Sequence, residues 1–232
     1  MVTNNSALGA DAVADTRASD GRIPGRRGLA TRARLLDCTA ELLDRMSYRE
    51  IKVIDIAREA RTSPATFYQY FPDIESAVLA LAEATNFDTA PLSDIVRGQS
   101  WRGAKGYDTA LSLVDALIEF WESHRAILRV VDLLVAEGDL RFRSVRQRLL
   151  NDLAIAMTEV IEQTEGSAAR PLATERRIPM ATAGVLVAML ANVATNRYTY
   201  EFWGIRTAEL RRSMADIVYT SLTRKMPPKG SR

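Results

Sequence analysis

The sequence is short of the residues on which many enzyme sites and disulfide-stabilised folds depend. It holds one histidine, His124, and one cysteine, Cys38, in 232 residues. An internal disulfide is therefore excluded, and so is any site that needs two histidines, such as a paired-histidine metal site. A single cysteine is typical of a protein that works in the reducing cytoplasm, which is the location we expect.

Long apolar runs and a strong net charge are also missing. The chain is 47% hydrophobic, yet no run approaches the roughly 20 apolar residues of a membrane-spanning helix. The net charge is only +2, so no overall basic field indicates nucleic acid. Basic residues are concentrated instead in one stretch without acidic residues, at Arg22, Arg26, Arg27, Arg32 and Arg34.

Residues 53–71 contain two short patterns with helical spacing. The apolar residues of the first recur at three- and four-residue steps, at Val53, Ile56, Ala57 and Ala60. A second helix is expected to begin at Pro64, because Ser63 is a suitable N-cap and a proline in the first helical position loses no hydrogen bond. Two short helices joined by such a turn are typical of a helix-turn-helix, whose second helix enters the major groove of DNA.

The outward groups of the second helix suit contact with DNA. Phe67 and Phe71 are predicted to point inward, leaving hydroxyls, an amide and small Ala65 to face phosphates and base edges. The segment GRIPGRRG before the first helix is either a solvated tail or a basic arm that contacts phosphates or a minor groove. The predicted DNA-binding residues are Arg26, Arg27, Thr62, Ser63, Pro64, Ala65, Thr66, Tyr68, Gln69 and Tyr70.

These helices belong to a longer pattern that extends from Thr31 to about Leu81. Its segments are TRARLLDCTAELL, Tyr48, VIDIAREA and SPATFYQYFPDIESAVLAL. With D-I-A, a three-residue turn, T-F-Y-x-Y-F and a following P-x-x-E, this stretch resembles the DNA-binding domain of the TetR family of bacterial transcriptional regulators. The resemblance implies a sequence-specific regulator that binds double-stranded operator DNA.

Three positions depart from the family pattern. Arg61 occupies the turn position that is usually glycine, and a left-handed backbone there would cost a non-glycine residue about 1 kcal/mol or more. Either the turn is reshaped, or the strain is tolerated because Arg61 reaches a phosphate. Lys52 replaces the serine or threonine that commonly starts the preceding helix, and Ile74 replaces a lysine that often contacts the DNA backbone.

No stretch alternates as a strand should, so we predict an all-α fold. Residues 1–24 lack the apolar block of a secretory signal and are expected to be a disordered tail. Thr31 is the expected cap of the first helix, and later helices are expected over residues 74–85, 107–123, 125–136, 140–164, 180–202 and 207–226. The predicted domains are a helix-turn-helix domain at 25–72, a ligand-binding and dimerisation domain at 73–226, and a C-terminal tail at 227–232.

The second domain is expected to bind an apolar small molecule, because the family's members typically do. Its identity is not given by the sequence, and a lipid or fatty acyl derivative would suit the aromatic and methionine side chains. Asn192 and Asn196 lie one turn apart on an apolar helix, where buried amides would bond to another helix or to a ligand. The predicted lining residues, which core packing would explain equally, are Trp101, Tyr107, Phe120, Trp121, Phe142, Met157, Asn192, Asn196, Tyr198 and Trp203.

The resemblance also implies a homodimer formed by the last two helices. The two DNA-binding domains of such a dimer, about 34–36 Å apart, would bind the two halves of a palindrome. The predicted interface residues are Val185, Met189, Leu210, Met214 and Ile217.

The implied mechanism is repression of a promoter. Ligand binding would relieve this repression, because it would change the separation of the two DNA-binding domains. A ligand must favour one state by about 5.5 kcal/mol to move a 1:99 balance to 99:1. A ligand-dependent activator or a co-repressed regulator is the first alternative. A helical small-molecule-binding protein without a DNA role is another, and DNA binding by the purified protein would separate the two classes.

An all-α enzyme is the third alternative and has little support in the sequence. The single histidine excludes a Ser-His-Asp arrangement that relies on a second one, and no glycine-rich phosphate motif is present. Glu159 and Glu162 are explained by a solvated helix face. We therefore predict no catalytic site, cofactor or metal.

Overall fold

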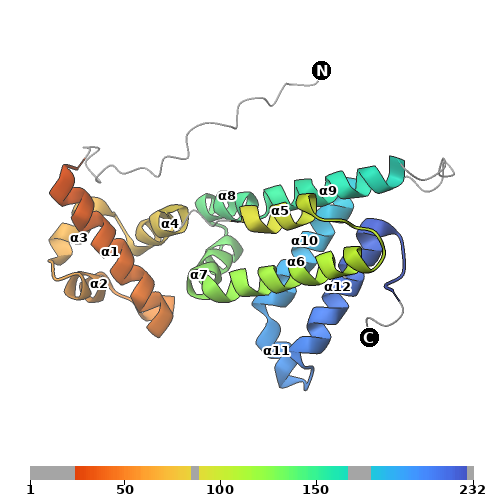
Figure 1. Ribbon diagram of the computed structural model, residues 1–232. Coiled ribbons are helices and arrows are strands. Elements are labelled where there is room, and N and C mark those ends of the chain that lie inside the picture. The colour runs from red at the N-terminus through yellow and green to blue at the C-terminus, as the bar shows by residue number, and fades with distance from the viewer. Residues whose placement is uncertain (1–23, 85–88, 167–178, 229–232) are drawn as a thin grey trace. The chain divides into compact units, whose positions relative to one another are not determined.

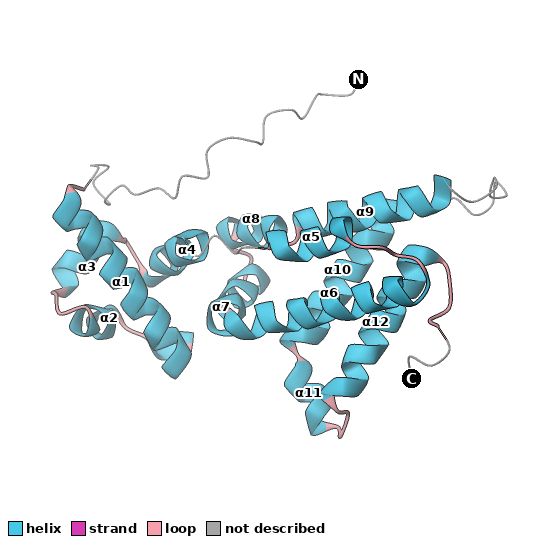
Figure 2. Cartoon of the chain, viewed as in Figure 1, coloured by secondary structure: helices cyan, strands magenta, loops and turns pink. Residues whose placement is uncertain are grey.

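The computed structural model describes residues 24–84, 89–166 and 179–228 (Figures 1 and 2). Within these ranges every regular element is a helix, which confirms the all-α prediction. No helix in them combines the length and apolar character needed to cross a membrane. The chain divides into two compact units, Met1–Asn86 and Phe87–Arg232, which we call the head and the body. The tails predicted at 1–24 and 227–232 lie outside the described residues, apart from Pro24 and residues 227–228.

The head is a small helical bundle around an apolar core. Its elements are α1 (Arg26–Arg45), the 3-10 turn η1 (Tyr48–Glu50), α2 (Val53–Glu59), α3 (Pro64–Tyr70) and α4 (Ile74–Ala84). Four side chains are completely buried in it, namely Leu35, Ile56, Phe67 and Val78, and Phe71 is nearly so. The first helix begins six residues earlier than predicted, with Gly25 at the N-cap. Thr31 is therefore no cap but lies inside α1, where its hydroxyl donates to the carbonyl of Arg27.

Helix α4 packs within the head. It contacts α1, and the Tyr48 hydroxyl donates to the carboxylate of Glu75 at 2.7 Å. Asp73 caps the helix by accepting a hydrogen bond from the N–H of Ser76 at 2.6 Å. These contacts link α4 to the head, and the chain divides into its two compact units between residues 86 and 87.

The body consists of eight helices among the described residues. They are α5 (Ala90–Gly98), α6 (Gly103–Ser123), α7 (Arg125–Ala136), α8 (Leu140–Leu149), α9 (Asn151–Gly166), α10 (Pro179–Thr195), α11 (Arg197–Phe202) and α12 (Thr207–Thr223). Helix α6 packs against α5, α10 and α12, while α9 packs against α5, α10 and α12 as well. These two helices therefore form the centre of the body.

Two helices predicted as continuous are each divided in the structure. Leu150 separates α8 from α9 with φ −122° and ψ 11°, and Asn196 separates α10 from α11 with φ −101° and ψ 17°. The first break preserves the apolar face, because Leu149, Leu150 and Leu153 are all buried. The hydrophobic pattern of the sequence is therefore continuous across the first break and does not indicate it.

The link between α5 and α6 is fixed by a close backbone contact. A side chain on Gly106 would place its Cβ 2.3 Å from the carbonyl carbon of Trp101, so only glycine fits. The Trp101 indole N–H in turn donates to the carbonyl of Val96 at 2.9 Å. Trp101 thus pins this link to the body.

Candidate functional site

Helix α3 has the local geometry predicted for a reading helix. The Ser63 hydroxyl accepts from the N–H of Thr66 at 3.1 Å, and Pro64 occupies the first helical turn. Phe67 and Phe71 are buried, with ring centroids 5.6 Å apart. The helix is therefore anchored to the head by one face and leaves the other exposed.

Most of the predicted DNA-binding residues are exposed, either on α3 and at its N-cap or at the start of α1. Seven of the ten are exposed, namely Arg26, Arg27, Ser63, Pro64, Ala65, Tyr68 and Gln69, and the other three are half-buried, namely Thr62, Thr66 and Tyr70. The start of α1 lies against the end of α3, since a Cβ on Gly28 would approach the Tyr70 hydroxyl to 3.2 Å. The structure thus brings the basic start of α1 beside the C-terminal end of α3.

The basic cluster noted in the sequence divides into two parts. Arg32 is buried, and its guanidinium stacks over the Phe71 ring at 5.1 Å. The Nε of Arg34 donates to the carbonyl of Ala60 at 2.8 Å and so satisfies the end of α2. These two arginines stabilise the head, whereas Arg26 and Arg27 face solvent.

The turn between α2 and α3 is not reshaped to suit Arg61. Arg61 adopts a left-handed backbone with φ 52°, and the N–H of Thr62 bonds to the carbonyl of Ala57 at 2.8 Å. Lys52 cannot cap α2 with its side chain, but its N–H donates to the Asp55 carboxylate at 3.2 Å. These two departures from the family pattern are thus accommodated without loss of the helix-turn-helix.

In the body, five of the predicted ligand-lining residues are buried core side chains. They are Tyr107, Phe120, Trp121, Phe142 and Met157. Two of them also have partners for their polar atoms: the Tyr107 hydroxyl donates to Asp216 at 2.8 Å, and the Trp121 indole N–H donates to the Thr195 hydroxyl at 2.6 Å. Packing alone accounts for the burial of these residues.

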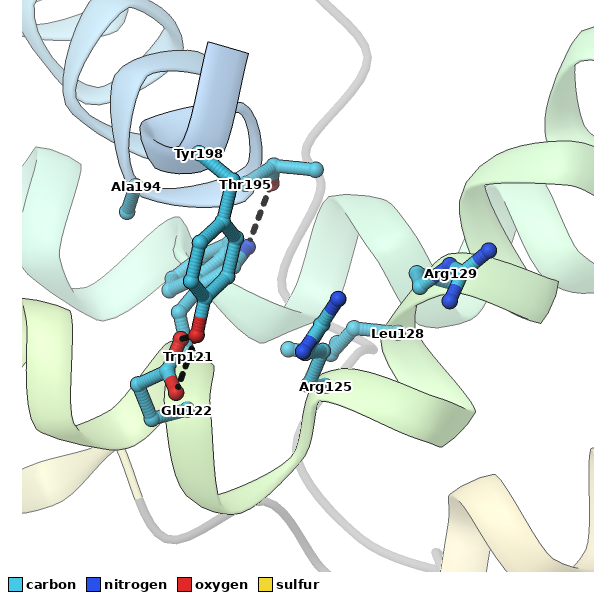
Figure 3. Close-up of a pocket in the computed structure, with 8 residues that line it drawn as sticks. All are labelled: Trp121, Glu122, Arg125, Leu128, Arg129, Ala194, Thr195 and Tyr198. Carbon is cyan, nitrogen blue, oxygen red and sulfur yellow. Dashed lines mark hydrogen bonds between the residues drawn. The ribbon is translucent and has the colours of Figure 1, made fainter. Parts of the chain in front are cut away.

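Trp121 and Tyr198 also line a small pocket (Figure 3). The pocket lies where α6, α7, α10 and α11 meet, with room for about one water molecule. Its full lining is Trp121, Glu122, Arg125, Leu128, Arg129, Ala194, Thr195 and Tyr198. The two arginines were missed by the sequence reasoning, although their four-residue spacing directly after Trp121 was a signal that they share a helix face.

The remaining predicted lining residues lie elsewhere. Asn192 and Asn196 are exposed in the single chain, so the expectation of buried amides is wrong there. The Asn196 side-chain amide donates to the carbonyl of Asn192 at 3.0 Å. Trp203 is 64% exposed at the end of α11, and Trp101 packs in the link described above.

The predicted interface residues differ in exposure. Val185 and Ile217 are exposed, and Met189 and Leu210 are half-buried. Met214 is different, because it is 3% exposed and packs in the body's own core. Met214 therefore has no surface to offer a second chain in this structure.

Sequence families and solved structures agree with this architecture. Residues 35–96 match the family described as bacterial regulatory proteins, tetR family, and residues 92–229 match the tetracyclin repressor-like C-terminal domain. No curated protein sequence matches the chain significantly.

The fold is shared with solved regulators of low sequence identity. A TetR-family transcriptional regulator from Streptomyces coelicolor is 16% identical with a TM-score of 0.58, over 86% of this chain and 82% of that one. The fatty acid degradation regulator FadR from Bacillus halodurans is 18% identical with a TM-score of 0.55, over 87% and 97%. FadR from Bacillus subtilis in complex with stearoyl-CoA is 14% identical with a TM-score of 0.59, over 82% and 98%. From the family matches and the exposed, capped α3, the chain belongs to the TetR family of DNA-binding transcriptional regulators.

Proposed function

We propose that the protein is a homodimeric repressor that binds a palindromic operator in the cytoplasm and is released by an apolar small molecule. The observation that supports DNA recognition by α3 is its division into a buried aromatic face and an exposed face. Gln69, Tyr68 and Ala65 stand on the exposed face, where an amide, a phenol and a small side chain suit base edges and phosphates.

The experiment is a gel shift with DNA that flanks the protein's own gene. Thr66→Ala and Tyr68→Ala should each weaken the complex, because the first removes a half-buried hydroxyl of α3 and the second an exposed phenol. Gln147→Ala on α8 is the matched control, since Gln147 is an exposed amide in the body. Equal affinity in all four proteins would contradict the assignment of α3 as the reading helix.

Dimerisation through α10 and α12 is supported by the exposed apolar groups on those helices. Val185 is 69% exposed and Ile217 is 44% exposed. An exposed aliphatic side chain gains about 1.5–3 kcal/mol when fully buried, which favours covering these positions. Val185→Asp with Ile217→Asp should yield a monomer in analytical ultracentrifugation, while Leu140→Asp, at an exposed leucine on α8, should leave a dimer.

The class of effector is supported by the likeness to FadR, for which a stearoyl-CoA complex has been solved. A fatty acyl compound is therefore the first to test for release of the operator complex. Dodecanoyl-CoA added to the gel shift should dissociate the wild-type complex in a concentration-dependent way. Failure of this and other acyl compounds to change DNA binding would overturn the effector response while leaving the DNA assignment intact.

A further inference from the structure

The pocket at the junction of α6 and α7 has an apolar floor and a basic rim. Trp121, Leu128 and Ala194 are buried at its base. Arg125 and Arg129 line it from α7, one helical turn apart, and both are exposed (Figure 3). A concave site with an apolar floor and a few convergent polar groups is the usual form of a small-molecule site.

The two rim arginines are not committed to acidic partners. In the described part of the chain neither forms an ion pair, although every other arginine near the pocket does. The guanidinium of Arg125 lies 4.6 Å from the centroid of the Tyr198 ring, which holds it beside the pocket. Their charges are consequently available to a ligand.

The one carboxylate in the lining is already neutralised. Glu122 accepts from the Tyr198 hydroxyl at 3.0 Å and pairs with Arg197 at 3.0 Å. Arg197 also lies 3.7 Å from Glu201. Arg146, whose guanidinium is 5.8 Å from the Trp121 ring, pairs with Asp132 at 2.8 Å. The excess positive charge around the pocket therefore belongs to Arg125 and Arg129.

We propose that this pocket binds the anionic group of the effector, a phosphate or a carboxylate. Arg125 and Arg129 donate to its oxygens, because guanidinium groups bond to both anions with paired N–H groups. Trp121 and Leu128 contact the adjoining apolar part of the same ligand. The room for about one water suits an oxygen-bearing group held between two exposed side chains, not a whole ligand.

This inference rests on the proposed response to a fatty acyl effector and adds where the charge of that effector is held. It is tested by direct binding without DNA, using isothermal titration calorimetry of the full chain. The probes are dodecanoate, dodecanoyl-CoA and dodecanol, which share a twelve-carbon chain and differ in the group at its end. The anion whose affinity depends on the arginines identifies the source as carboxylate or phosphate.

Arg125→Gln with Arg129→Gln should weaken the binding of at least one anionic probe about tenfold or more. The affinity for dodecanol should change by less than about twofold, because only the anions lose charge-assisted hydrogen bonds. Arg125→Lys with Arg129→Lys should retain most of the affinity. Arg102→Gln with Arg143→Gln, which removes the same charge at exposed sites, should have no effect. Glu122→Gln should strengthen anion binding, because it removes the acidic partner of Arg197 and so leaves more positive charge beside the pocket.

The inference is overturned if the glutamine variant binds both anions as tightly as wild type does, or if wild type binds neither anion. It is also overturned if the variant loses as much affinity for dodecanol as for the anions. Operator release in a gel shift separates this result from the proposed function. Release by dodecanoyl-CoA that is equally potent in wild type and variant would sustain the effector response and refute the pocket. Arginine-dependent binding without release of DNA would sustain the pocket and refute the response.

Discussion

Replacing Arg61 by glycine should stabilise the head. Arg61 holds a left-handed backbone with φ 52°, a conformation that costs a non-glycine residue about 1–2 kcal/mol. Glycine would remove that strain but lose about 0.5–1 kcal/mol through the greater freedom of its unfolded backbone. Among the described residues the exposed Arg61 side chain forms no hydrogen bond or ion pair, so truncation sacrifices no contact. The expected net gain is about 0.5–1 kcal/mol.

Amide hydrogen exchange across α2 and α3, read by mass spectrometry on the full chain, measures this gain locally. A gain of that size should slow exchange about two- to fivefold, since 1.4 kcal/mol is a factor of ten. Arg61→Ala is the matched control, because it removes the same side chain while keeping a Cβ at the strained position. Arg61→Ala should therefore exchange at nearly the wild-type rate. If glycine and alanine give the same rate, or if glycine speeds exchange, the strain argument is refuted.

Four further outcomes are expected. Both Arg61 variants should reduce the salt dependence of operator binding by about one unit of log K against log salt if this charge meets a phosphate, and an unchanged slope in a gel-shift series would refute that contact. Ser63→Ala should lower the free energy of unfolding by about 1 kcal/mol in urea denaturation, because the cap on the Thr66 N–H is lost. Met214→Ala should cost about 2–5 kcal/mol in the same assay as a core truncation, and a smaller loss would place Met214 outside the core. Cys38 should react with a thiol reagent far more slowly in the native state than in urea. Burial and the nearby carboxylates of Glu41, Glu59 and Asp37 raise the pKa of its thiol, so less thiolate is present at any given pH.

The helix-turn-helix could be predicted because its determinants are local in sequence. Ser63 and Pro64 specify the start of α3, and the spacing of Phe67 and Phe71 specifies its buried face. Nothing beyond a few neighbouring residues was needed for this part of the fold. The exposed face of α3 followed from the same periodicity.

The roles of the individual arginines could not be predicted, because their partners are distant in sequence. Arg34 bonds to a carbonyl 26 residues away, and Arg32 stacks on Phe71. In the body, the apolar pattern also hid the break at Leu150, since buried leucines lie on both sides of it. The sequence supplied the charges and the apolar faces, whereas tertiary packing decided which charges remained available.

The bond from Arg34 to the end of α2 affects how any mutational scan of the first helix should be read. The Arg34 side chain holds the last residues of α2 through this bond, so replacing it would destabilise the helix-turn-helix even in the absence of DNA. An alanine scan of the basic positions would then show a loss of DNA affinity from two different causes, a lost contact with DNA or a destabilised head. Variants at Arg26 or Arg27 would change the dependence on ionic strength, whereas variants at Arg32 or Arg34 would lower the melting temperature first.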